Sequence, residues 1–289
     1  IRNGANRKVL DRIVETTRIF EAWSDEPWVN EGAAVRVSLL CFGGRNGDET
    51  VSRLDGAEIG SIHSDLSAGE GLNLTKANAL AENKRTTFIG GMKKGSFDVP
   101  GELARTWLLA AGNPNGRPNA DVLRPWVNGL DITRRPMDAW IVDFGVDCSL
   151  DDASSYEKPF EHVLANVKPA RDAVRNPLER NRWWLHARPA PELRQAITKL
   201  PRFIGTARVA KHRLFTWLRS PVVCDGQVVV IARADDTTFG VLHSRFHELW
   251  SLRLCTWMGV GNDPRYTPST TFETFPFPTG MTPADTAAG

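Results

Sequence analysis

The pattern of apolar and polar positions along the chain predicts helices and strands in mixed order. Residues 5–23 carry apolar side chains at helical spacing, which predicts a helix. Residues 33–43 alternate and are rich in β-branched side chains, as in a buried strand. Asp55-Gly56 lies between two short apolar segments and favours a hairpin turn. The polar stretch 64–87 predicts a linker with a short helix.

A second region begins near Phe88 and mixes the two periodicities. Leu242, Phe246, Leu249 and Trp250 share one face of its last helix, which we therefore expect to be a core element. Mixed helices and strands favour an α+β fold. Helices are predicted at 100–112, at 156–176 with a break at Pro169, at 190–200 and at 236–255; strands at 139–145, 202–209, 212–218 and 227–233; extended chain at 265–278; and a disordered tail at 279–289.

Charge is distributed unevenly, although the net charge is only +2. Residues 168–219 contain thirteen Lys and Arg against three acids, whereas residues 143–161 contain six acids and one Lys. Residues 201–220, here called the basic ribbon, hold five cations and no acid, with aromatic and aliphatic residues between them. Clustered cations provide the sequence-independent part of DNA affinity. The alternative is that the ribbon is a solvated face of a sheet.

Other chemistry has little support in the sequence. Four cysteines lie far apart without a Cys-x-x-Cys pair, which disfavours a zinc site or a disulfide framework and favours a reducing cytoplasm. No apolar run approaches the roughly 18 residues of a membrane span. His243 and His247 have the i, i+4 spacing of metal ligands, but the Glu of a zinc protease motif is missing, so packed or capping histidines are preferred. The glycine-rich stretches match no phosphate-binding loop.

Several long segments resemble one family of DNA-modifying enzymes. The segment EAWSDEPWVNEGAAVRVSLLCF (21–42) is similar to the late strand, motif VIII, of an adenine-N6 DNA methyltransferase domain. The target-recognition region of MmeI-like type IIL restriction–modification enzymes is similar to DVLRPWVNGLDITRRPMDAWIVDFG, RNRWWLHARP, ARVAKHRLFTWL, VVVIARADDTTFGVLHSRFHELWSL and RYTPSTTFETFPFP. The resemblance implies the last strands of a class I methyltransferase domain over 1–87, a mixed α/β target-recognition domain over 88–278, and a disordered tail over 279–289.

The departures from the family pattern define what this chain is expected to lack. It contains no Pro-Pro pair, so the family's Asn-Pro-Pro-Tyr catalytic loop is absent, and so is the glycine-rich motif that binds S-adenosyl-L-methionine. We therefore expect the C-terminal part of a methyltransferase, whose N-terminal catalytic half belongs to the same protein. This chain alone is expected to be inactive, with no catalytic, cofactor-binding or metal-binding residue. The full-length protein, here called the parent, would use S-adenosyl-L-methionine and flip the target adenine from the duplex.

The resemblance also suggests which residues contact double-stranded DNA. Arg208, Lys211 and Arg213 of the basic ribbon are expected to contact phosphates, which set register without reading sequence. In the family, a variable segment before Arg-Tyr-Thr/Ser reads one base pair. Here this segment is GVGNDPRYTP, which gives Gly261, Asn262 and Asp263 as base-reading residues. Asn can pair with adenine, and Asp can accept from a cytosine amine. An ordinary Asn-Asp-Pro turn is the alternative.

Two other functions stay open at this point. One is a stand-alone DNA-binding or protein-interaction module with no enzymatic parent. The other is the recognition part of a phage-defence methyltransferase from a different system that shares the same elements.

Overall fold

The chain forms two compact units, and the computed structural model describes residues 7–44, 51–68, 77–258 and 263–288. Unit 1 comprises Ile1–Ala81, Val209–Lys211 and Arg245–Pro276. Unit 2 comprises Glu82–Arg208, His212–Ser244 and Phe277–Gly289. Unit 2 thus begins close to the predicted boundary at Phe88, whereas Arg245–Pro276 belongs to unit 1. None of the helices in the described part of the chain has the length and apolar character of a membrane span.

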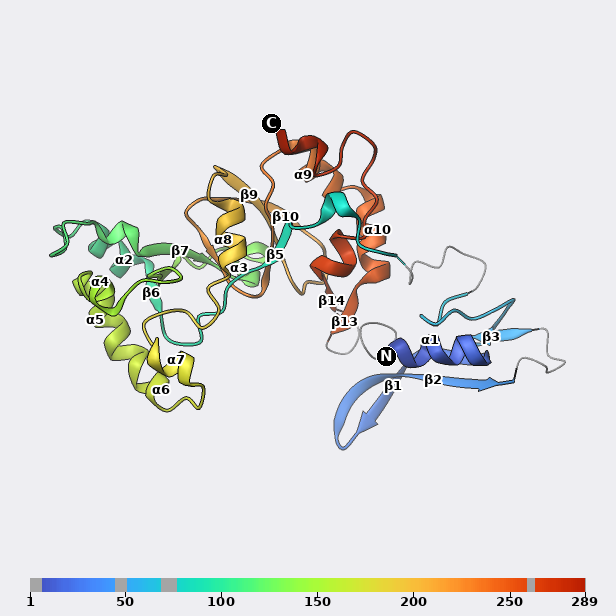
Figure 1. The fold of residues 1–289 in the computed structure, drawn as a ribbon. Coiled ribbons are helices and arrows are strands. Elements are labelled where there is room, and N and C mark those ends of the chain that lie inside the picture. Colours follow the sequence, from blue (N-terminus) through green and yellow to red (C-terminus); the bar gives the residue numbers. More distant parts are fainter. Residues whose placement is uncertain (1–6, 45–50, 69–76, 259–262, 289) are drawn as a thin grey trace. The chain divides into compact units, whose positions relative to one another are not determined.

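The N-terminal part of unit 1 is a helix packed on a four-stranded sheet in the order β2-β1-β3-β4 (Figure 1). Asp55 and Gly56 have φ angles of +53° and +82°, as the two central residues of a type I′ turn do, which confirms the predicted hairpin. The elements are α1 (Arg7–Thr16), β1 (Arg18–Asn30), β2 (Ala33–Gly43), β3 (Ser52–Leu54) and β4 (Ala57–Ile59), and the core residues are Leu10, Ile19, Ala22, Ile62 and Leu66.

The helix predicted at 5–23 is correct only as far as Thr16, where α1 ends. Beyond it, β1 pairs with β2 in an antiparallel ladder that sets Ile19 against Phe42 and Ala22 against Leu40. Ile19 and Ala22 are buried beneath α1, so packing within the sheet outweighs the helical period of this segment. The strand predicted at 33–43 is β2, but the expectation that it is buried is wrong, because Leu39 is 43% exposed and Phe42 is 50% exposed.

The remainder of unit 1 comes from the C-terminal third of the chain. The short 3-10 helix η3 (Ala81–Asn83) includes the last residue of this segment of unit 1 and the first residues of unit 2, and Leu80 donates its N–H to the carbonyl of Glu273 (2.8 Å). The prediction of extended chain at 265–278 is wrong at its centre, which forms a π-helix. The elements are α10 (Arg245–Leu254), β13 (Thr256–Met258), β14 (Asp263–Arg265) and the π-helix η5 (Pro268–Phe272).

One half of unit 2 is a four-stranded sheet in the order β11-β7-β8-β6 with helices packed on it. Its core draws on the strands, through Val99, Trp126 and Ile141, and on the helices, through Val163. The break predicted at Pro169 is confirmed, because α5 ends at Asn166 and α6 starts at Lys168. The elements are β6 (Asp98–Pro100), α2 (Gly101–Leu108), η4 (Asn119–Asp121), β7 (Leu123–Val127), β8 (Ala139–Val142), α4 (Leu150–Ser154), α5 (Glu157–Asn166), α6 (Lys168–Asp172), α7 (Pro177–Asn181) and β11 (Val223–Cys224).

The other half of unit 2 is a second four-stranded sheet in the order β10-β9-β12-β5. Leu193 of α8 and Ile132 of α3 pack on one face of it, against Phe203. Phe239 of α9 stacks on Trp217 on the opposite face (ring centroids 4.6 Å apart). The strands confirm those predicted between 202 and 233. The elements are β5 (Thr87–Ile89), α3 (Gly129–Thr133), α8 (Pro191–Ile197), β9 (Arg202–Ala207), β10 (Phe215–Arg219), β12 (Val228–Ile231) and α9 (Asp236–Leu242).

The single core helix predicted at 236–255 is wrong in two respects. It is two helices, α9 and α10, because His243 closes α9 by bonding through its backbone N–H and its ring Nδ1 to the carbonyl of Phe239 (3.3 and 3.0 Å). In α10, Phe246 is 81% exposed and Leu249 is 50% exposed. The buried positions of that helix are His247 and Ser251.

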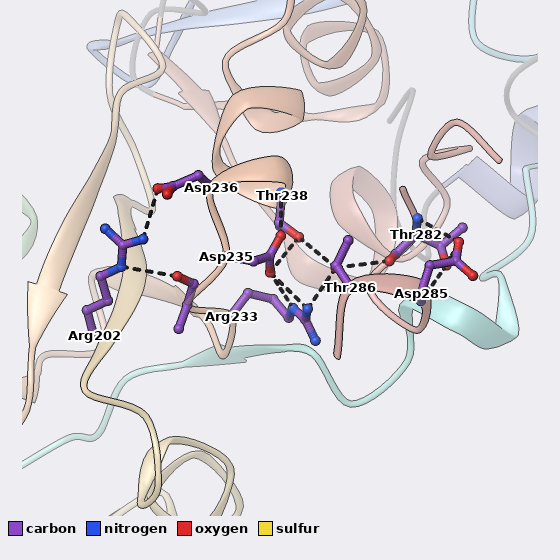
Figure 2. Close-up of polar contacts among 9 residues, drawn as sticks. Arg202, Arg233, Asp235, Asp236, Thr238, Thr282, Asp285 and Thr286 are labelled. Carbon is purple, nitrogen blue, oxygen red and sulfur yellow. Dashed lines mark hydrogen bonds and ion pairs between the residues drawn. The ribbon is translucent and has the colours of Figure 1, made fainter. Parts of the chain in front are cut away.

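The C-terminal segment, for which composition predicts disorder, is ordered as far as Ala288 and ends in the 3-10 helix η6 (Asp285–Ala288). Thr282 precedes this turn and donates through its hydroxyl to Asp285 (2.7 Å). Arg233 donates to the Thr286 hydroxyl (2.7 Å) and pairs with Asp235, whose carboxylate caps α9 by accepting from Thr238 N–H (Figure 2). Thr286 thereby ties the tail to the start of α9.

Candidate nucleic-acid interface

The basic ribbon is built from β9, β10 and the turn between them. The two strands pair antiparallel, with Phe215 opposite Thr206 and Arg219 opposite Arg202. A Cβ at Gly205 in β9 would lie 2.5 Å from Leu218 Cδ1, so a larger residue there would force the Leu218 side chain to shift. Residues 203–207 are all buried, so β9 itself presents little to solvent, and the turn at 208–214 carries the exposed side chains.

The three predicted phosphate-contacting residues differ in how they are held. Arg213 donates to the Thr206 hydroxyl (3.1 Å) and to the carbonyl of Ala207, and Arg208 lies near the carbonyl of Gly226 (3.4 Å). Both arginines are half-buried, so their guanidinium groups are oriented by the protein. Lys211 is exposed at the tip of the turn.

Within unit 1, the ribbon turn lies beside the predicted base-reading segment. Val209 forms an antiparallel bridge with Arg265, and the N–H of Ala210 points to the carbonyl of Pro264 (3.4 Å). This register places Lys211 opposite Asp263, although the two residues are far apart in sequence. Asp263 is the first residue of β14 and pairs with Met258 of β13. The other two predicted reading residues, Gly261 and Asn262, lie outside the described residues.

A buried hydrogen bond holds β14 against α10. The hydroxyl of Tyr266 lies 3.0 Å from Nε2 of His247, and both side chains are buried. His247 also packs edge-on against Phe275 (ring centroids 4.8 Å apart). The preference for a packed histidine at 247 is therefore confirmed, and within the described ranges no cluster of His, Cys, Asp or Glu has metal-binding geometry. No local signal in the sequence indicates this partner of His247, because Tyr266 lies on a separate element.

Acids from other segments neutralise part of the basic block at 168–219. Arg194 binds Asp143 with two hydrogen bonds (2.8 and 3.0 Å), and Arg182 lies 3.3 Å from Asp147. Both acids belong to the acid-rich stretch at 143–161, so a charge separation that is clear in the sequence is partly lost in the fold. In the described part of the chain, the block cations that form ion pairs are Lys168, Arg171, Arg182, Arg194 and Arg202, the last with Asp236 (Figure 2).

The pair with the most buried carboxylate, that of Asp143, is a structural element of unit 2. Asp143 follows β8 and is almost fully buried beside His186 and Arg194. Burial acts to raise the pKa of the Asp143 carboxyl, but His186 and the bidentate Arg194 outweigh it, so this pKa lies below its ordinary value. Burial lowers the pKa of His186. The pair joins the two halves of unit 2, because Arg194 lies on α8.

Comparison with solved structures finds the same fold in a restriction–modification enzyme. The structure of the type IIL enzyme MmeI in complex with DNA matches with a TM-score of 0.66 and 15% sequence identity. The match covers 96% of this chain and 38% of that chain, so this chain spans well under half the length of that enzyme. No curated protein matches the chain.

The family model described as MmeI, target recognition domain, matches residues 147–279. Residues 147–279 are therefore similar to an MmeI-type target recognition domain. The matched residues include the basic ribbon, α9, α10 and the β13–β14 pair. Lys211 and Asp263, which the fold places opposite each other, both lie among the matched residues.

Proposed function

We propose that this chain performs DNA-sequence recognition for a site-specific adenine-N6 DNA methyltransferase of the restriction–modification type. The observation that carries the proposal is the match of residues 147–279 to the MmeI target recognition domain. The shared fold with an enzyme solved on DNA supports it. The partner is double-stranded DNA, bound in the cytoplasm.

In this proposal, binding and reading are performed by neighbouring residues. Lys211 and the two oriented arginines, Arg208 and Arg213, contact phosphates on each side of the ribbon turn. Asp263, with Gly261 and Asn262, faces the base edges, and its carboxylate accepts from a cytosine amine. The register of the ribbon turn with β14 supports this division, because a phosphate contact at Lys211 would fix the depth of Asp263 in the groove.

The methyl transfer belongs to the rest of the parent protein. That part binds S-adenosyl-L-methionine and receives the flipped adenine, whose amino group is inaccessible inside the stacked duplex. This chain contributes no catalytic and no cofactor-binding residue; it holds the duplex in register so that one adenine is presented.

Two measurements test the proposal together. The purified chain should bind duplex DNA in a salt-dependent manner in fluorescence anisotropy, and it should transfer no label from S-adenosyl-L-methionine to DNA. Methylation-sensitive sequencing of DNA from cells that express the full-length protein should then show N6-methyladenine at one sequence. Binding without any methylation by the full-length protein would favour a stand-alone DNA-binding module, and absence of DNA binding would refute the proposal.

A further inference from the structure

The loop after α3 is fastened at both ends by a single carboxylate. Asn128 caps α3 by accepting from the N–H groups of Leu130 (2.7 Å) and Asp131 (3.2 Å). Asp131 returns the contact by accepting from the N–H of Asn128 (2.8 Å). Its second oxygen accepts from the N–H of Met137 (3.0 Å). Residues 132–136 are thus closed into a loop of defined shape.

This loop presents two arginines that the protein does not use internally. Arg134 and Arg135 are both exposed, and neither side chain forms an ion pair or a hydrogen bond within the described part of the chain. In the described structure, Asp131 forms no ion pair with either arginine, and both of its oxygens accept from backbone N–H groups. The nearby Asp138 is already paired with Arg105 (2.7 Å).

Packing does not explain why the loop is fixed. Ordering each residue of a loop costs roughly 1–2 kcal/mol of backbone entropy. The loop buries little in return, since Met137 is 67% exposed and both arginines lie in solvent. A rigid loop that displays two uncompensated cations is the arrangement expected of a preorganised anion-binding element.

The loop is also carried by the sheet that carries the basic ribbon. Ile132 of α3 and Leu218 of β10 both pack against the hydrophobic cluster that contains Phe203 of β9. At the other end of α3, Gly129 adjoins Ala207, the residue before Arg208. The position of the loop relative to β9 and β10 is therefore fixed by a hydrophobic core in unit 2 (Figure 1).

We propose that Arg134 and Arg135 form a second phosphate-contacting element, which binds the sugar–phosphate backbone of duplex DNA alongside the basic ribbon. This inference rests on the proposed function in DNA recognition. Guanidinium groups suit the role, because they bind phosphate oxygens with two parallel N–H donors and are always charged.

The test is a salt series of duplex binding by fluorescence anisotropy with the double variant Arg134→Ala/Arg135→Ala. Each lost phosphate contact lowers the slope of log affinity against log salt by about 0.9, so the double variant should lower it by about 1.8. Affinity should fall for every duplex sequence alike. Arg134→Lys/Arg135→Lys should retain most of the slope, because Lys also contacts phosphate.

The control is Arg175→Ala/Arg180→Ala, which removes the same charge. These arginines are exposed and form no ion pair in the described ranges, and Figure 1 shows α7, which contains Arg180, well away from α3. The inference is overturned if the α3-loop variant changes the slope no more than this control does, while the wild-type chain binds DNA. A wild-type chain that binds no duplex overturns the proposed function itself. Unchanged thermal midpoints would establish that both double variants fold.

Discussion

Replacing Tyr266 by Phe should destabilise unit 1 and reduce discrimination at one base pair of the DNA, while the phosphate contacts stay unchanged. The substitution removes one hydroxyl and keeps the ring. That hydroxyl lies 3.0 Å from Nε2 of His247, and both side chains are buried, so no water replaces the lost partner. Tyr266 follows β14 directly, and β14 begins with Asp263. Loosening this anchor should therefore affect the predicted reading residue.

The expected cost follows from the burial of both partners. Leaving a buried polar atom without its hydrogen bond costs about 1–3 kcal/mol. For a domain of this size, the midpoint falls by roughly 2–4 °C per kcal/mol. The chain's other tyrosine provides the control: the Tyr156 hydroxyl lies 3.4 Å from Asp121, which also accepts from Arg117 (2.8 Å). Tyr156→Phe should cost less than about 1 kcal/mol.

Urea unfolding of the two variants measures the difference, and duplex binding measures its consequence. Tyr266→Phe should reduce discrimination at one base pair in the full-length protein, while the salt slope of binding stays at the wild-type value. Equal destabilisation by the two Tyr→Phe changes would refute the structural reasoning. A changed salt slope with intact discrimination would show that Tyr266 supports phosphate contacts instead.

Three further changes test other parts of the structure. Asp263→Arg in the full-length protein should move the preference at one base pair from cytosine towards guanine, by about 1–3 kcal/mol, and an unchanged methylated sequence would place base reading elsewhere. Lys211→Ala should lower the salt slope of duplex binding by about 0.9. An unchanged slope would show that the tip of the basic ribbon is a solvated surface without a phosphate contact. Arg194→Ala should destabilise unit 2 by about 3–5 kcal/mol in urea unfolding, because it removes the arginine partner of the buried Asp143 carboxylate. Since the pKa of Asp143 is lowered in the folded protein, the stability from this pair should be present above about pH 4 and lost on acidification below it, and a variant with the wild-type acid midpoint would contradict this.

The sequence predicted those elements whose signals are local. Strand β2 contains the alternating segment Val35-Arg36-Val37-Ser38, and Asp55-Gly56 supplies the positive φ angles that a tight hairpin needs. The break at Pro169 follows from the missing N–H of proline. In each case, the deciding interaction lies within a few residues.

Elements decided by distant partners could not be predicted in this way. The end of α1 depends on β2, which pairs with residues 18–30. In α10, the spacing of apolar residues predicts that Phe246 and Leu249 are buried. The helix instead buries His247, because Tyr266 forms a hydrogen bond with it and Phe275 packs against it. Composition likewise does not reveal that Arg233 would order the tail through Thr286.

The candidate site was predictable in part. Positive charge and family resemblance indicated the basic ribbon, and the fold adds that Lys211 lies in register with Asp263. The neutralisation of Arg182 and Arg194 by Asp147 and Asp143 was not visible, since it depends on how the two halves of unit 2 fold together.

The shared core of unit 2 limits how sequence specificity can be exchanged between relatives. Its residues come from both sides of position 147: Phe97, Trp126 and Ile141 precede the matched target recognition domain, and Val163 and Trp183 lie within it. A chimera that joins two proteins at 147 would combine half of one core with half of another and create mismatched packing. Recombination that preserves this core must carry the strands from Glu82 onward together with the helices that cover them. Under the proposed function, single substitutions at positions such as 263 would be the less disruptive route to a new target sequence.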